Sequence, residues 1–141
     1  ILSDMKNKEK EALEFYGRNL GLTFQIADDT LDYNSELKIF GKEIGNDFYE
    51  GKITLPIILL HQKASKDEKY ELKEIFKKNE RTEVEFKKII KLIKKYNIIS
   101  DCYKKAEHFI NLSANSLSVF ENNKEKDIFQ NLASFSLERT F

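Results

Sequence analysis

The chain has 141 residues, and its 24 lysines and arginines balance 24 aspartates and glutamates, so its formal net charge is zero. This balance gives no electrostatic footprint for nucleic acid, and we expect no nucleic-acid partner. A single cysteine, Cys102, excludes an internal disulfide framework and indicates a reducing, cytoplasmic location, while no apolar run approaches the ~20 residues that span a membrane.

Residues 11–33 form the first predicted helix, because apolar side chains recur along them at intervals of three and four. The predicted core-facing stripe consists of Leu13, Tyr16, Leu20, Phe24, Ala27 and Leu31. Near the end of this helix, Asp28 and Asp32 lie one turn apart, and Asp29 falls within the same arc beside the stripe. Gln25 lies on that arc one turn earlier. We therefore expect a group of oxygen-bearing side chains on one side of the helix end.

The spacing of the three aspartates has two interpretations. Carboxylates beside a core-facing stripe are costly to bury unless a positive charge neutralises them. Mg²⁺ takes one or two protein carboxylates and fills its remaining positions with water and phosphate oxygens, so the DDxxD spacing is suited to a magnesium–phosphate site. The alternative is a solvated acidic patch without a ligand, because short motifs are weak indicators by themselves.

The stretch after the aspartates contains glycine-marked turns, which the sequence predicts at residues 41–42 and 45–47. Lys42 follows the aspartates closely enough to fold back toward them. Thr54 is placed to cap the next helix, and Pro56 is tolerated in the first turn of that helix. Aspartates and lysines grouped around one helix end are suited to a diphosphate that is bridged by a metal ion, with ammonium groups on the remaining oxygens.

The rest of the chain shows helical periodicity and no strand pattern, so the predicted fold is all-α. Further helices are predicted at residues 55–64, 83–97, 100–120 and 124–139. Within the charged stretch 65–82, Tyr70, Leu72, Ile75 and Phe76 predict a short amphipathic helix that the sequence KNERTE ends. In the last helix, the residues expected to face the core are Ile128, Leu132 and Phe135. Neither His61 nor His108 has a second histidine or a cysteine at ligand spacing, so we expect no metal role for them.

The predicted helix over residues 83–97 is basic and amphipathic. Thr82 and Glu85 match a capping box at its start. The helix could contact anionic lipid, but we favour a core-packed helix with a solvated, lysine-rich face.

Two adjoining segments resemble a known protein family. They read FQIADDTLDY (24–33) and GKEIGNDFYEGKITLP (41–56), and they resemble the second aspartate-rich region of the trans-type isoprenyl (polyprenyl) diphosphate synthases. The resemblance continues more loosely upstream in FYGRNLGLTF and downstream to LASFSLERTF. The segment EGKITLP resembles the corresponding segments of the medium- and long-chain, octaprenyl-like synthases more than those of the short-chain farnesyl enzymes.

This resemblance implies a fold and a domain organisation. Residues 1–141 correspond to the C-terminal portion of the isoprenoid-synthase helical bundle, and the N-terminal half, which carries the first aspartate-rich motif in the family, is absent from this sequence. We therefore expect the chain to be inactive alone. The functional form implied by the resemblance is a homodimer or a complement with an N-terminal half.

The resemblance also implies a reaction, in which isopentenyl diphosphate condenses with an allylic diphosphate by ionisation, alkene attack and proton loss. The implied cofactor is Mg²⁺. Asp28 is expected to bind it directly, and Asp29 and Asp32 directly or through water. A peripheral membrane contact through the greasy product is also expected.

Four further site residues are carried over from the family motif. Lys42 is expected to contact the allylic diphosphate, and Gln25 and Lys52 are additional substrate-binding candidates, Lys52 having a structural role as its alternative. Asp47 is expected to hold a metal-bound water or to orient a lysine. Two other classes of function stay open: a non-catalytic subunit that keeps the synthase fold, and a helical interaction module whose aspartates are merely solvated.

Overall fold

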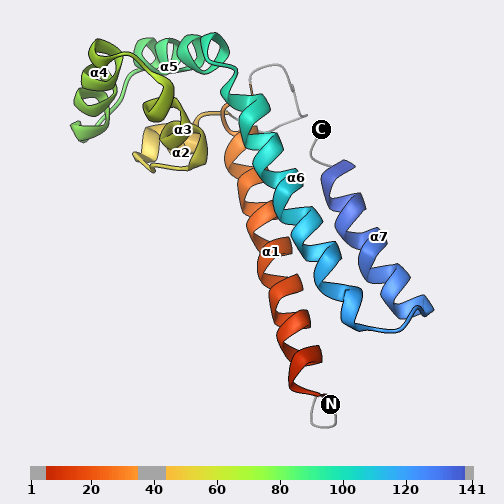
Figure 1. Cartoon of the computed structure of the whole chain (residues 1–141). Helices are drawn as coiled ribbons and strands as arrows, with labels where there is room; N and C mark the ends of the chain where they lie inside the picture. The colour runs from red at the N-terminus through yellow and green to blue at the C-terminus, as the bar shows by residue number, and fades with distance from the viewer. Residues whose placement is uncertain (1–5, 35–43, 139–141) are drawn as a thin grey trace. The chain divides into compact units, whose positions relative to one another are not determined.

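The computed structural model describes residues 6–34 and 44–138, and within them it contains helices and connecting turns without a strand (Figure 1). The helices are α1 (Asn7–Leu31), α2 (Asn46–Glu50), α3 (Leu55–Lys63), α4 (Lys66–Lys77), α5 (Glu83–Lys95), α6 (Ile98–Ser116) and α7 (Lys124–Glu138), with the 3₁₀ turn η1 (Leu117–Val119) before α7. The all-α prediction is confirmed. Two compact units divide the chain: residues 27–103, and residues 1–26 together with 104–141.

The unit of residues 1–26 and 104–141 is built from most of α1, the larger part of α6, and α7 (Figure 1). Its buried cluster consists of Tyr16, Ile110, Leu117 and Ala133. The Tyr16 hydroxyl donates to the carbonyl of Phe129 at 2.7 Å, and the Tyr16 carbonyl accepts from the Ser113 hydroxyl at 2.9 Å. Tyr16 therefore ties α1 to both other helices, as its place on the predicted stripe requires.

The buried stripe of α1 differs from the predicted one. Phe24 is 51% exposed, whereas Asn19 and Thr23, which lie off the apolar pattern, are buried. The Asn19 amide donates to the carbonyl of Phe15 at 2.7 Å, and the Thr23 hydroxyl donates to the carbonyl of Asn19 at 3.1 Å. Short polar side chains can enter a core when nearby backbone carbonyls satisfy them, and a count of apolar spacing does not register this.

The predicted core face of the last helix is wrong. Ile128, Leu132 and Phe135 are 64%, 44% and 53% exposed, while Ala133 is fully buried. α7 packs through this small residue because a methyl side chain allows close helix approach, and the larger apolar side chains lie on the remaining surface.

The unit of residues 27–103 has an aromatic core around α2. Phe48 is fully buried, and its ring lies 5.3 Å from the rings of Tyr49 and Phe86 and 5.7 Å from that of Phe76. The Arg81 guanidinium donates to the carbonyls of Phe76 and Tyr49 at 3.0 and 3.3 Å, which links the end of α4 to α2. The short helix α2 is therefore anchored by its one buried side chain.

The start of α5 has the predicted capping box. The Thr82 hydroxyl accepts from the backbone N–H of Glu85, and the Glu85 carboxylate accepts from the backbone N–H of Thr82. The apolar side chains of α5 that are buried are Phe86, Ile89 and Ile93. Lys87 pairs with Glu83 at 2.6 Å on the exposed face. These contacts support the core-packed interpretation of this helix. In the described part of the chain, no helix combines the length and apolar character needed to cross a bilayer.

Two glutamates of this unit have depressed pKa values, so we expect the stability of the fold to depend on pH in the acid range. Hydrogen bonds from Lys95 and Tyr96 lower the pKa of Glu68 to about 2, and those from Lys78 and Thr82 lower the pKa of Glu85 to about 2, against a usual 4.5. Because both values are depressed in the folded state, their stabilisation is present above pH 4.5 and is lost as the pH falls toward about 2.

We therefore expect the free energy of unfolding, measured by urea denaturation, to fall across that window. The double variant Glu68→Gln/Glu85→Gln should show a flatter dependence on pH. A matched control is Glu80→Gln, because Glu80 is exposed in the turn between α4 and α5. An unchanged slope in the double variant would contradict the assignment.

Candidate functional site

The three predicted aspartates lie at the C-terminal end of α1, in the unit of residues 27–103. Asp28 is exposed, Asp29 is half-buried, and Asp32 is 4% exposed. The three carboxylates therefore differ in their access to solvent, although they share one side of the helix.

Asp32 is joined to the start of α2. Its carboxylate accepts the backbone N–H of Asn46 at 3.2 Å through Oδ1 and that of Asp47 at 2.8 Å through Oδ2. The Asp32 backbone carbonyl accepts the N–H of Gly45 at 2.9 Å. Burial raises the pKa of Asp32, and the α2 hydrogen bonds oppose that rise. The chain therefore returns from residue 45 onto the end of α1.

Gly45 is required for this return. Its φ is 91°, in the left-handed region, and a Cβ at this position would lie 2.7 Å from Cζ of Phe86. A side chain here would be strained by its backbone angle and would collide with the aromatic core. This is a physical reason for the second glycine of the predicted turns.

The carboxylates interact with one another. The pKa of Asp29 is raised to about 6 from a usual 3.8. Burial is the largest cause, followed by the negative charges of Asp47, Asp28 and Asp32, and the positive charge of Lys52 opposes the rise. The Lys52 ammonium donates to Asp47 at 3.2 Å and also pairs with Glu50 at 2.5 Å. The end of α1 and the start of α2 thus form an acidic group whose negative charge is incompletely neutralised.

Tyr33 is a neighbour of this group that the sequence pattern did not single out. Its side chain is 1% exposed. Burial raises the pKa of the Tyr33 hydroxyl, and the charges of Asp32 and Asp47 add to the rise, so the hydroxyl keeps its proton at neutral pH. The available signal was its position directly after the DDxxD sequence.

The other predicted site residues have different outcomes. Asp47 and Lys52 form an ion pair at 3.2 Å, and the role of Asp47 in orienting a lysine stays a prediction. Gln25 is exposed on α1 and belongs to the other unit. Lys42 lies outside the described residues. The predicted N-cap Thr54 occupies that position with Pro56 in the first turn of α3, but its side chain makes no capping hydrogen bond.

Within residues 6–34 and 44–138, no group of three or more acidic, histidine or cysteine ligands is arranged to hold a metal ion. A closed cage of the kind that holds structural zinc is therefore absent from this part of the chain. The donors nevertheless fit Mg²⁺, which needs only one or two carboxylates and keeps several waters. Asp28 and Asp29 are adjacent carboxylates, Asp28 exposed and Asp29 half-buried. The negative charges of Asp47, Asp28 and Asp32 add to burial in raising the pKa of Asp29.

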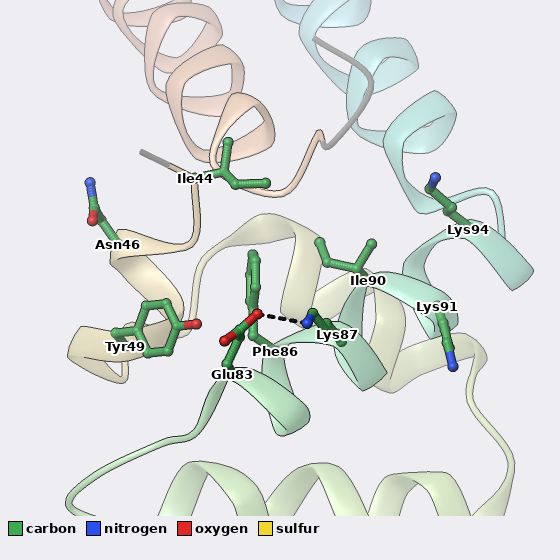
Figure 2. A pocket seen from close by; sticks show the side chains of 9 residues that line it. All are labelled: Ile44, Asn46, Tyr49, Glu83, Phe86, Lys87, Ile90, Lys91 and Lys94. Atoms are coloured by element: carbon green, nitrogen blue, oxygen red, sulfur yellow. Dashed lines mark ion pairs between the residues drawn. The ribbon is translucent and has the colours of Figure 1, made fainter. Parts of the chain in front are cut away.

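A separate cavity of about 740 Å³ lies in the same unit, along one face of α5 (Figure 2). Its described lining combines the apolar Ile44, Phe86 and Ile90 with Lys87, Lys91 and Lys94. The aspartates of α1 are not among the described residues that line it. The acidic group, and not this cavity, therefore carries the chemistry of the candidate site.

The fold and the site together define a class of all-α proteins. In this class a helix ends in the sequence DDxxD, and a turn that contains a glycine packs against that helix end and carries an acidic and a basic side chain. The chain belongs to the polyprenyl synthetase family, whose model matches residues 1–93. The predicted family is thereby confirmed.

Relatives and solved structures agree with this assignment. A short chain isoprenyl diphosphate synthase of Methanothermobacter thermautotrophicus is 32% identical over 139 residues, which are 99% of this chain and 42% of the relative. An octaprenyl diphosphate synthase of Escherichia coli is 47% identical over 58 residues, 41% of this chain and 18% of the relative. Because relatives with short-chain and octaprenyl names both match, the octaprenyl-like subclass stays a prediction.

Among solved structures, a decaprenyl diphosphate synthase from Rhodobacter capsulatus matches with a TM-score of 0.86 and 26% identity, covering 96% of this chain and 42% of that one. A polyprenyl synthase from Caulobacter crescentus, complexed with calcium and isoprenyl diphosphate, matches with a TM-score of 0.83 and 32% identity, covering 97% and 42%. The chain thus spans less than half the length of these relatives.

Proposed function

We propose that this chain supplies the second aspartate-rich site of a Mg²⁺-dependent polyprenyl diphosphate synthase, which condenses isopentenyl diphosphate with an allylic diphosphate. The observation that carries the proposal is the acidic group itself: α2 returns onto the end of α1, and the charge of Asp47 acts on Asp29. The family assignment and the calcium and isoprenyl diphosphate in the Caulobacter crescentus synthase support it.

The proposed roles follow from exposure and charge. Asp28 and Asp29 present accessible oxygens for the metal. Asp47, which pairs with Lys52 at 3.2 Å, is proposed to hold a metal-bound water or to orient that lysine. Bound Mg²⁺ supplies Lewis-acid stabilisation for the diphosphate that leaves as the allylic C–O bond breaks. On the family motif alone, Lys42 and Lys52 are proposed to contribute fixed positive charge to the remaining phosphate oxygens.

The functional form is proposed to include an N-terminal half, because this chain spans 42% of its relatives. Two copies of that complete unit would form a homodimer. The proposed location is cytoplasmic, with peripheral membrane contact only through the product.

The test combines this chain with the N-terminal half of a family member that carries the first aspartate-rich motif. We expect the pair to bind inorganic pyrophosphate by calorimetry in the presence of Mg²⁺ and to transfer prenyl groups to isopentenyl diphosphate. The chain alone should bind pyrophosphate weakly or not at all and should transfer nothing.

One control and two further outcomes separate the alternatives. Removing Mg²⁺ with EDTA should abolish both signals, because the diphosphate is held through the metal. A pair that assembles and binds pyrophosphate with Mg²⁺ but transfers no prenyl group would indicate a non-catalytic subunit. Assembly without any Mg²⁺-dependent binding would indicate a helical interaction module and would refute the proposal.

A further inference from the structure

Asp32 differs from its two neighbours in what its oxygens contact. Both carboxylate oxygens accept backbone N–H groups of α2, from Asn46 at 3.2 Å and from Asp47 at 2.8 Å. The side chain is 4% exposed. With the bond from Gly45 to its backbone carbonyl, Asp32 makes three contacts with three consecutive residues.

Such an environment disfavours direct metal ligation. Mg²⁺ gives up its waters reluctantly and usually reaches protein carboxylates with several of them still bound. A hydrated ion needs open space beside the carboxylate, which the exposed Asp28 and the half-buried Asp29 have and the buried Asp32 lacks.

Resting on the proposed function, we infer that Asp32 is a positioning residue, which holds the start of α2 and with it Asp47 at the end of α1, and that it is not itself a ligand of the metal. The backbone N–H of Asp47 itself donates to the Asp32 carboxylate at 2.8 Å, so loss of that carboxylate would release Asp47 from the end of α1.

A carboxylate is needed because the two donors approach two different oxygens. An asparagine at this position could accept only one of the N–H groups, and its own amide hydrogens would face the other. Hydrogen bonds to charged groups are stronger than neutral ones, so their loss should be measurable locally.

The first measurement is amide hydrogen exchange by NMR on the 141-residue chain. We expect Asp32→Asn to accelerate exchange at Asn46 and Asp47 by at least about 10-fold, in line with the loss of a charge-assisted hydrogen bond. Asp28→Asn is the matched control and should leave both amides protected. Should Asp32→Asn fail to fold, Asp32→Ser keeps one acceptor in a smaller side chain and replaces it.

The second measurement is Mn²⁺ binding, followed by the paramagnetic resonance signal of free Mn²⁺, in a double-mutant cycle. If Asp32 acts through Asp47, Asp32→Asn should weaken binding, and adding it to Asp47→Asn should weaken binding no further. Asp28→Asn, which removes an independent ligand, should add its full effect to that of Asp47→Asn.

The outcomes separate this inference from the proposed function. Additive effects of Asp32→Asn and Asp47→Asn would make Asp32 a ligand and overturn the inference alone. Unchanged exchange at residues 46 and 47 would do the same. A lower thermal midpoint with unchanged Mn²⁺ affinity would mean that Asp32 only stabilises the fold, and it would overturn the inference. No Mn²⁺ binding by the unaltered chain would overturn the metal site and the inference together.

Discussion

Asp28→Ala is expected to lower kcat for prenyl transfer by about 10²–10³-fold in the synthase assembled with an N-terminal half. Removing one group that stabilises developing charge in the transition state typically lowers kcat by about this factor. The physical reason is that the metal loses an accessible carboxylate, so the charge on the departing diphosphate is less stabilised. Kinetics at saturating Mg²⁺ and substrate, with far-UV circular dichroism on the same sample, provide the measurement.

Helicity should be unchanged, because Asp28 is exposed near the end of α1. Asp67→Ala is the matched control, since Asp67 is an exposed aspartate in the first turn of α4. Turnover near that of the unaltered synthase would refute the role of Asp28.

Phe48→Ala should have the largest effect on stability. Phe48 is fully buried among Tyr49, Phe76 and Phe86, and truncation of a buried phenylalanine costs about 3–5 kcal/mol. The chain has no tryptophan, so urea unfolding is best followed by circular dichroism at the helical band.

A suitable comparison is Tyr70→Ala, which removes an aromatic ring that is 68% exposed and should change the free energy of unfolding by no more than about 0.5 kcal/mol. Because Phe48 anchors α2, its truncation should also loosen the hydrogen bonds from α2 to Asp32. A loss of less than about 1 kcal/mol would contradict the packing of this aromatic cluster.

Local rules account for much of what the sequence predicted correctly. The helical class follows from apolar spacing, and Thr82 with Glu85 forms a capping box because both partners are three residues apart in one turn. The DDxxD spacing and the loop that follows it identified the family, because the segment carries residue types at fixed separations that packing alone does not demand.

Predictions that depended on what covers a helix were less successful. α1 buries Asn19 and Thr23 and exposes Phe24, and α7 packs through Ala133 while Ile128 stays on the surface. Apolar periodicity measures which side chains could be buried. Which of them are buried depends on the neighbouring helix and on whether backbone carbonyls satisfy short polar groups.

The sequence by itself determined the helical class, the family and the arc on which Asp28, Asp29 and Asp32 lie, because these depend on residue type and on separation along one chain segment. Only the tertiary structure decided how the three carboxylates differ. Backbone N–H groups of α2, 14 and 15 residues after Asp32, donate to its buried carboxylate, while Asp28 is exposed. The difference in exposure among the aspartates thus depends on a long-range contact, which helical spacing cannot predict.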